Sequence, residues 1–301
     1  MFRSGFVCLA GRPNAGKSTL TNALVGQKVA ITSSRPQTTR HVIRGLVNRA
    51  DAQLILVDTP GLHRPRTLLG ERLNDEVRSA WAEVDAIGMC VPADQRIGPG
   101  DRFLMEQLAA LTHTPVLAVL TKIDLVSRDA LAERLQAVEE AGREAGLDFR
   151  DIVPVSARAG EQVEVLADLL VATLPEGPEL YPGGVISDET DESMVAELIR
   201  EAALEDVRDE LPHSIAVVVD EMVSRKDRDR PLMDVRVNLF VERESQKPIV
   251  IGREGAGLKR IGQRARPQIE TLLGVPVFLD VRVKVAKDWQ RDAKQLRRLG
   301  L

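Results

Sequence analysis

The sequence is poor in aromatic residues and cysteine, and it contains no long hydrophobic run. Phe, Trp and Tyr make up 3% of the 301 residues. Cys8 and Cys90 lie in apolar stretches without a CxxC spacing, which favours buried, reduced thiols over a disulfide or a metal site. Apolar runs such as 115–120 fall well short of the ~20 residues that cross a bilayer. Because a strand-like run follows Met1 almost at once, we expect no signal peptide and a cytoplasmic protein.

The charge of the chain is divided unevenly. The formal net charge is −4, from 41 basic and 45 acidic residues. Residues 212–301 hold 19 basic and 12 acidic residues, a net charge of +7. The rest of the chain then holds 22 basic and 33 acidic residues, a net charge of −11. A basic C-terminal third beside an acidic remainder predicts a polyanionic partner for one part of the chain only.

The first 174 residues alternate short apolar runs with longer helical patterns. The apolar runs have few polar interruptions, as buried parallel strands do. The short connection between the second and third runs allows only an antiparallel hairpin. These features predict a mostly parallel sheet with helices on both faces. The expected strands lie at 5–11, 41–49, 52–58, 86–91, 115–120 and 151–156.

The pattern changes after a stretch rich in proline and glycine at 175–190, which we interpret as a linker. The residues at 191–211 form one amphipathic helical pattern with an acidic start. Two strands, a short helix near Ile249, a glycine-rich loop, a helix from about Leu258 to Leu273 and a last strand are expected after it.

Residues 11–18, GRPNAGKS, match the phosphate-loop pattern GxxxxGK[ST] between a strand and a helix. In such a loop backbone N–H groups surround the phosphates, Lys17 would neutralise β/γ oxygens, and the Ser18 hydroxyl would ligate Mg²⁺. The residues predicted to contact the nucleotide here are Gly11, Arg12, Pro13, Asn14, Ala15, Gly16, Lys17, Ser18 and Thr19.

Two later motifs favour guanine over adenine. Asp124 of TKID could accept hydrogen bonds from both N1–H and N2–H₂ of guanine, and adenine has no such pair of donors. The dipeptide at 156–157 ends the next strand, where a backbone N–H can reach guanine O6. The residues predicted at the base are Thr121, Lys122, Asp124, Ser156 and Ala157.

The motif DTPGL at 58–62 follows another strand. Asp58 is placed to hold Mg²⁺ through water, and the Gly61 N–H to sense a γ-phosphate. RPQTTR at 35–40 supplies a threonine for the metal, and we favour Thr39 over Thr38. The predicted metal set is Ser18, Thr39 and Asp58, the catalytic set is Lys17, Thr39 and Gly61, and further nucleotide contacts are Thr59, Pro60 and Leu62.

This series of motifs is similar to that of the translation-factor class of small GTPases. With DESMVAELIRE and IVIGREGAGLKRIG, the chain resembles the Era family of bacterial GTPases along essentially its whole length. The resemblance implies an α/β P-loop GTPase domain at 1–174 and, after the linker, an α+β type II KH domain with a basic tail at 191–301. Thr121 departs from the family, which usually has Asn there, but a threonine hydroxyl can still support the phosphate loop.

Leu62 stands where Ras-type GTPases have a glutamine that orients water. Since a hydrophobic side chain cannot polarise water, hydrolysis would depend on backbone groups, Mg²⁺ and a monovalent cation. In similar GTPases an asparagine at the position of Asn14 helps to bind K⁺. We therefore expect slow hydrolysis of GTP to GDP and phosphate, stimulated by K⁺, with His63 merely solvated.

The glycine-rich loop near the C-terminus is too irregular to be a second phosphate loop, because Lys259 comes one residue late. Gly252 and Gly255 leave room for a sugar-phosphate backbone. In the KH domains of the Era family such a GxxG loop binds about four nucleotides of single-stranded RNA. The residues predicted to bind RNA are Gly252, Arg253, Glu254, Gly255, Lys259, Arg260, Arg282, Lys284 and Lys287.

Two aspects of this loop region stay open in the sequence. The carboxylate of Glu254 would repel phosphate unless it faces solvent or binds an exocyclic amine. Trp289 could stack on a base, but we favour packing in the core.

The resemblance also implies cofactors and partners. These are GTP or GDP with Mg²⁺, K⁺, and the 3′ end of 16S rRNA in a precursor of the small ribosomal subunit. It further implies peripheral association with the cell membrane, for which the composition offers no support. We expect a monomer in which GTP orders residues 33–40 and 58–70 and sets the orientation of the KH domain.

Two alternatives remain. One is an RNA-binding protein with a nucleotide-dependent conformation and negligible hydrolysis. The other is a GTPase whose C-terminal domain binds protein only, against which the single GKS and the intact GxxG argue.

Overall fold

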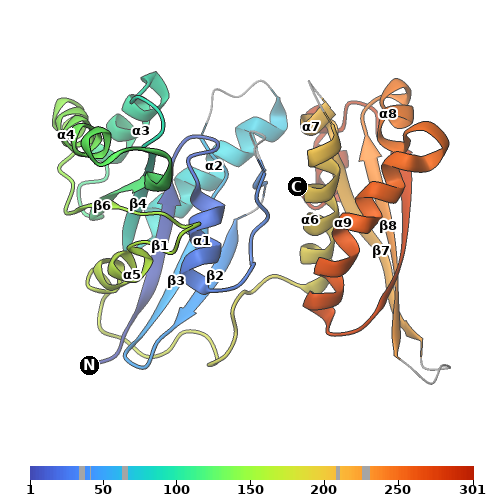
Figure 1. Ribbon diagram of the computed structural model, residues 1–301, viewed down its shortest axis with the longest axis horizontal. Coiled ribbons are helices and arrows are strands. Elements are labelled where there is room, and N and C mark those ends of the chain that lie inside the picture. The colour runs from blue at the N-terminus through green and yellow to red at the C-terminus, as the bar shows by residue number, and fades with distance from the viewer. Residues whose placement is uncertain (34–37, 41, 63–66, 208–210, 226–230) are drawn as a thin grey trace. The chain divides into compact units, whose positions relative to one another are not determined.

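The computed structural model describes residues 1–33, 38–40, 42–62, 67–207, 211–225 and 231–301, without the side chain of residue 206. His63 and residues 35–37 of the RPQTTR segment lie outside these residues. The chain forms two compact units (Figure 1). The first holds the residues up to Asp188 except a short segment just before Gly70, and the second holds that segment and Glu189–Leu301.

The first unit contains a six-stranded sheet in the order β2-β3-β1-β4-β5-β6. β2 is antiparallel to β3 and the other pairs are parallel, so the predicted sheet is confirmed. The strands are β1 (Arg3–Ala10), β2 (Ile43–Asn48), β3 (Ala52–Asp58), β4 (Ala86–Pro92), β5 (Val116–Thr121) and β6 (Ile152–Pro154).

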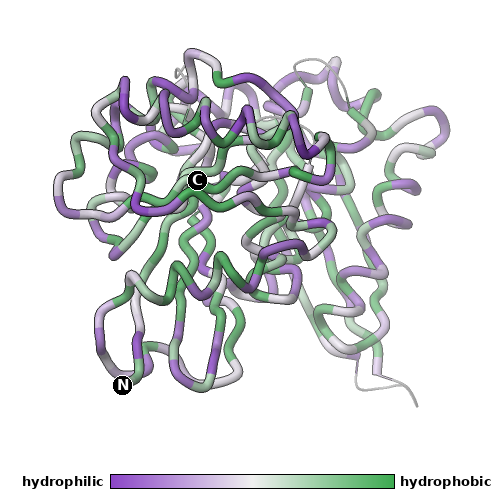
Figure 2. The backbone as a smooth tube through the Cα atoms, turned by 60° about the vertical axis from the view of Figure 1, so that its left-hand side comes forward, coloured by the Kyte–Doolittle hydropathy of each residue, from purple (hydrophilic) through white to green (hydrophobic). Residues whose placement is uncertain are grey.

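Helices cover both faces of this sheet. One buried apolar cluster joins the sheet to α2, α3 and α4, and a second joins it to α1 and α5. The strands are hydrophobic nearly throughout, whereas the helices alternate between hydrophobic and hydrophilic residues (Figure 2). The helices are α1 (Lys17–Val25), α2 (Leu68–Glu83), α3 (Pro99–Ala109), η1 (Ile123–Leu125), α4 (Arg128–Glu144) and α5 (Val163–Val171).

The stretch interpreted as a linker is attached to the first unit as far as Asp188. The buried side chain of Gln53 on β3 accepts the N–H groups of Leu180 and Tyr181 and donates to the Tyr181 carbonyl. The Leu46 N–H donates to the Ile186 carbonyl at 2.8 Å. These bonds hold residues 180–186 against the β2–β3 hairpin, so this part of the stretch lies against the sheet of the first unit.

The second unit has a three-stranded sheet in the order β7-β8-β9, with β7 antiparallel and β9 parallel to β8. The long helices α6 and α9 lie against it (Figure 1). The strands are β7 (Ala216–Arg225), β8 (Leu232–Val241) and β9 (Val277–Val285). The helices are α6 (Asp191–Asp206), α7 (Leu211–Ser214), η2 (Glu244–Gln246), α8 (Lys247–Ile251), η3 (Arg253–Gly255), α9 (Ala256–Leu273), η4 (Trp289–Arg291) and α10 (Ala293–Arg298).

One predicted element in this unit is wrong in length. The helix expected over 191–211 ends at Asp206, because Val207 has an extended backbone with φ −106° and ψ 154°. Val207 is β-branched and buried, and its burial outweighs the helical periodicity around it. The expectation for Trp289 is correct, since its ring is fully buried and its Nε1 donates to the Ser214 carbonyl at 3.1 Å.

Candidate active site and nucleic-acid interface

The phosphate loop connects β1 to α1 in an unusual backbone conformation. Asn14 has φ 63° and Gly16, which precedes the first residue of α1, has φ 94°. Such left-handed residues persist when the surrounding contacts fix them. Two contacts do so: the Thr121 Oγ1 donates to the Ala15 carbonyl at 2.6 Å, and the Lys17 Nζ donates to the Gly11 carbonyl at 3.1 Å. The hydroxyl of Thr121 therefore supports the loop, as the sequence predicted.

Lys17 and Asp58 form the buried charged centre of the site. Burial lowers the pKa of Lys17, and the nearby Asp58 acts against that shift. Burial raises the pKa of Asp58 to about 6, against the effect of Lys17 and of the Ser18 hydroxyl. Within the described chain, neither carboxylate oxygen of Asp58 has a hydrogen-bond partner of normal geometry. A buried carboxylate in this state is suited to a cation.

The three residues predicted to hold Mg²⁺ fit such an ion. The hydroxyl oxygens of Ser18 and Thr39 lie 3.0 Å apart, and Thr39 is buried. Both oxygens and the Asp58 carboxylate are hard ligands of the kind that Mg²⁺ prefers. This placement favours Thr39 over Thr38.

The DTPGL motif contacts the phosphate loop through its glycine. A Cβ added to Gly61 would lie 2.8 Å from the Pro13 nitrogen, so only glycine fits there. The side chain of Thr59 points instead to β1, where its hydroxyl meets the Leu9 carbonyl at 3.4 Å. Leu62 is buried in the core cluster beneath α2. Thr59 and Leu62 can therefore act on a nucleotide only through their backbone.

The base-binding motifs meet at the ends of β5 and β6. The Ser156 hydroxyl donates to Asp124 Oδ1 at 2.6 Å and accepts the Ala159 N–H at 3.1 Å. Asp124 itself is exposed. Lys122 has a left-handed backbone with φ 59°, and its Nζ lies 3.7 Å from Asp94 Oδ2. The contact with Ser156 orients the carboxylate that was predicted to bind guanine.

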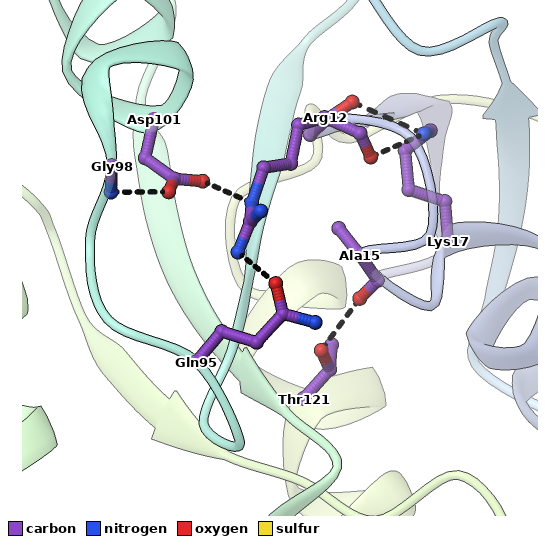
Figure 3. A network of polar contacts seen from close by, with 8 residues as sticks. Arg12, Ala15, Lys17, Gln95, Gly98, Asp101 and Thr121 are labelled. Carbon is purple, nitrogen blue, oxygen red and sulfur yellow. Dashed lines mark hydrogen bonds and ion pairs between the residues drawn. The ribbon is translucent and has the colours of Figure 1, made fainter. Parts of the chain in front are cut away.

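Arg12 lies in the phosphate loop, but its side chain does not point toward the phosphates. Its Nη2 donates to Gln95 at 2.7 Å and its Nε lies 3.0 Å from Asp101 (Figure 3). Only the backbone of Arg12 remains as a contact for a nucleotide.

The GxxG loop of the second unit depends on glycine in two different ways. Gly252 has φ 73°, and an added Cβ would lie 2.6 Å from the Gly257 nitrogen. Gly255 has φ 79° but open space around it. Between them Arg253 and Glu254 are 94% and 87% exposed, and they lie 3.8 Å apart as a weak ion pair. Glu254 therefore faces solvent, with its charge close to a guanidinium.

The basic residues predicted to bind RNA fall into two groups. Lys259 and Arg260 are exposed in the first turns of α9, next to the GxxG loop. Arg282 and Lys284 alternate along β9 with the buried Val283, so they lie on the opposite face of the strand. Arg282 is also paired with Asp280 at 3.0 Å. Lys287 is exposed beyond β9. Lys259 and Arg260 thus follow the loop directly on α9, whereas Arg282 and Lys284 lie on the exposed face of β9.

Several residues that support these sites were not predicted from the sequence. Asp101 and Gln95 contact Arg12 from more than 80 positions away, and no local pattern marks them. Gly257 was not predicted to shape the loop, yet an added Cβ would lie 2.2 Å from the Val250 carbonyl. The spacing G-x-x-G-x-G could have identified this third glycine.

Fold and site together define a class of protein: a P-loop GTPase unit followed by a KH-type unit. A family model described as "50S ribosome-binding GTPase" matches residues 6–122, and one described as "KH domain" matches 210–290. The chain is 66% identical to the GTPase Era of Streptomyces coelicolor over 300 residues, covering 99% of this chain and 95% of that protein. It is 63% identical to GTPase Era of Mycolicibacterium smegmatis, covering 99% of both. The chain belongs to the GTPase Era family.

Solved structures agree with this assignment. An Era complex with MgGDPNP and nucleotides 1506–1542 of 16S ribosomal RNA has a TM-score of 0.94 at 34% identity, covering 100% of this chain and 99% of that chain. A variant of Aquifex aeolicus Era bound to GDP·AlF₄⁻ has a TM-score of 0.93 at 34% identity, covering 99% of both. Membership in a family of GTPases favours a hydrolysing enzyme over the alternative of negligible hydrolysis.

Proposed function

We propose that this GTPase binds the 3′ end of 16S rRNA in a nucleotide-dependent manner during assembly of the small ribosomal subunit. The observation that carries the proposal is the exposed GxxG loop, beside Lys259 and Arg260, in the same chain as a complete GTP site. The Era complex with 16S rRNA supports the identity of the RNA. The KH unit would be 191–301 and the GTPase unit 1–174, with a connector at 175–190.

In the proposed GTP site the loop N–H groups and Lys17 bind the phosphates, and Asp124 with the 156–157 turn binds guanine. Ser18, Thr39 and Asp58 would hold Mg²⁺, which neutralises charge on the β- and γ-phosphates when it is bound. A water attacks the γ-phosphorus while the bond between the γ-phosphorus and the β-γ bridging oxygen breaks. GDP leaves with that oxygen, and the proton of the water goes to the released phosphate. The Gly61 N–H is the group of DTPGL that would stabilise the developing charge.

Hydrolysis by this site should be slow. Leu62 is buried in the core, and a hydrophobic side chain cannot orient the attacking water. We propose that K⁺, bound with the help of Asn14, supplies part of the missing charge stabilisation. Phosphate release measured in KCl should exceed that in NaCl, and equal rates would rule out this role.

The β2–β3 hairpin offers a route from nucleotide to connector. β3 ends at the metal-binding Asp58, and β2 begins shortly after Thr39. The connector pairs with the same hairpin through Gly45 and Ser187 and through Gln53. A nucleotide that displaces the hairpin would therefore also displace the chain that leads into the KH unit.

The cellular location of the protein follows from its proposed RNA partner. Precursors of the small subunit are cytoplasmic, and we place the protein there as a monomer. Among the helices that the structure describes, none is long and apolar enough to cross a bilayer. Peripheral association with the inner face of the membrane remains part of the proposal, and flotation with anionic vesicles tests it.

RNA binding at the GxxG loop is tested by two alanine variants. Gly252→Ala forces a Cβ against the Gly257 backbone and should weaken binding of a fluorescein-labelled 16S rRNA 3′-end oligonucleotide by tenfold or more. Gly262→Ala, on α9 where an added Cβ meets nothing within 4 Å, serves as the control. Equal affinity for both variants would place the RNA elsewhere.

A further inference from the structure

The side chain of Arg12 connects the phosphate loop to the segment between β4 and α3. Its Nε lies 3.0 Å from Asp101 Oδ1, and its Nη2 donates to Gln95 Oε1 at 2.7 Å. We call Arg12, Gln95 and Asp101 the Arg12 cluster (Figure 3). Because the guanidinium is engaged in this cluster, it contributes to the site through the position of the loop.

Asp101 is rigidly placed for this contact. Its side chain is fully buried, and its Oδ2 accepts the Gly98 N–H at 2.9 Å, the bond that closes the first turn of α3. One carboxylate oxygen thus fixes the helix start while the other faces Arg12. The Arg12 side chain is 27% exposed, and ion pairs that reach solvent contribute little to stability. The charge is therefore better explained by a positioning role than by stability.

The same segment also contacts the base-binding motif. Asp94 Oδ2 lies 3.7 Å from the Lys122 Nζ, and the Ala93 N–H donates to the Thr121 carbonyl at 2.8 Å. Thr121 in turn donates to the Ala15 carbonyl of the phosphate loop. Residues 93–98 therefore touch the phosphate side of the nucleotide site through Arg12 and its base side through Lys122.

The phosphate loop needs such external contacts because of its backbone. Asn14 and Gly16 are left-handed, and donors aimed at phosphates are effective when they are held in place before the ligand arrives. We propose that Gln95 and Asp101 are positioning residues that hold the phosphate loop through Arg12 and so slow the release of guanine nucleotides. This proposal rests on GTP binding at the loop and is independent of the proposed coupling to RNA.

The test is the dissociation rate of a fluorescent GDP from three variants, measured by stopped flow at 25 °C. Arg12→Gln and Asp101→Asn should each raise the rate by about tenfold, since each removes one charge of the pair. The amide of Asp101→Asn can still accept the Gly98 N–H, so α3 keeps its first turn. Arg102→Gln is the matched control, because it removes the ion pair of the next residue with Glu144 and leaves the cluster intact.

The double variant separates positioning from general stability. Arg12→Gln combined with Asp101→Asn should dissociate GDP no faster than either single variant, because both break the same contact. The proposal is overturned if the two effects multiply, or if the variants melt at lower temperature while GDP dissociates at the wild-type rate. If Asp101→Asn fails to fold, Arg12→Gln and Gln95→Ala decide alone, and unchanged rates in both overturn the proposal.

Discussion

The two glycine-rich loops of this protein use similar backbone conformations in opposite surroundings. Asn14 in the phosphate loop and Glu254 in the GxxG loop are both left-handed, at φ 63° and 52°. The phosphate loop is held by Lys17, Thr121 and Arg12. Its ends are buried although Asn14 is exposed, whereas the middle residues of the GxxG loop are almost fully exposed. An enclosed loop suits a small ligand that is bound on all sides, and an open loop suits one stretch of a long polymer.

The largest expected effect comes from the enclosed loop. Lys17→Met keeps the length of the side chain but removes the buried charge that faces the phosphates, so GDP affinity should fall by at least about 100-fold. In the absence of nucleotide, RNA affinity should stay within about threefold of the wild type. Isothermal titration with GDP and an RNA titration measure the two quantities. A loss of RNA affinity without nucleotide would show that the loops are not separate sites.

A second substitution tests how the enclosed loop is held. Thr121→Val removes the donor to the Ala15 carbonyl and leaves that carbonyl unpaired, so GDP should dissociate about tenfold faster. Thr121→Asn introduces the residue that the family usually has at this position. It keeps a hydrogen-bond donor and is the control. Equal dissociation rates for the two variants would show that this hydrogen bond does not hold the loop.

The open loop should respond mainly through charge. Lys259→Gln should weaken RNA binding severalfold and reduce the slope of log affinity against log salt by about 1, the loss of one phosphate contact. Lys294→Gln removes the same charge from the exposed surface of α10, 35 residues further along the chain. An unchanged slope for Lys259→Gln, or an equal change for Lys294→Gln, would remove Lys259 from the RNA interface.

The last prediction distinguishes the two units by the effect of pH on their stability. Burial raises the pKa of Cys8 and Cys90 to about 12 from the usual 9.0, and both lie in the first unit. Since the folded pKa is the higher one, each thiol lowers the free energy of unfolding as the pH rises from 9 toward the folded pKa. Urea unfolding is followed by tryptophan fluorescence in variants that keep only Trp81, in the first unit, or only Trp289, in the second. The loss of stability should appear in the first unit only.

The thiol contribution is isolated by a double variant. Cys8→Ala combined with Cys90→Ala should remove the loss of stability that the two thiols cause in the first unit above pH 9. A loss that persists in this variant would come from other groups.

What the sequence could predict follows the range of the contacts involved. GRPNAGKS, TKID and DTPG are contiguous, and parallel strand order alone brings their ends to one edge of the sheet, so the nucleotide site was predictable. Asp101 and Gln53 were not, because each binds a segment far along the chain through tertiary packing. The placement of Arg282 was available from strand alternation, whereas the end of α6 depends on the burial of Val207.

Control of the open loop by the enclosed loop can be measured in one titration series. Labelled 16S rRNA 3′-end oligonucleotide is titrated into the protein with GDPNP, with GDP and without nucleotide, each with Mg²⁺. We expect at least about tenfold tighter binding with GDPNP than with GDP. Equal affinity in all three states would contradict it.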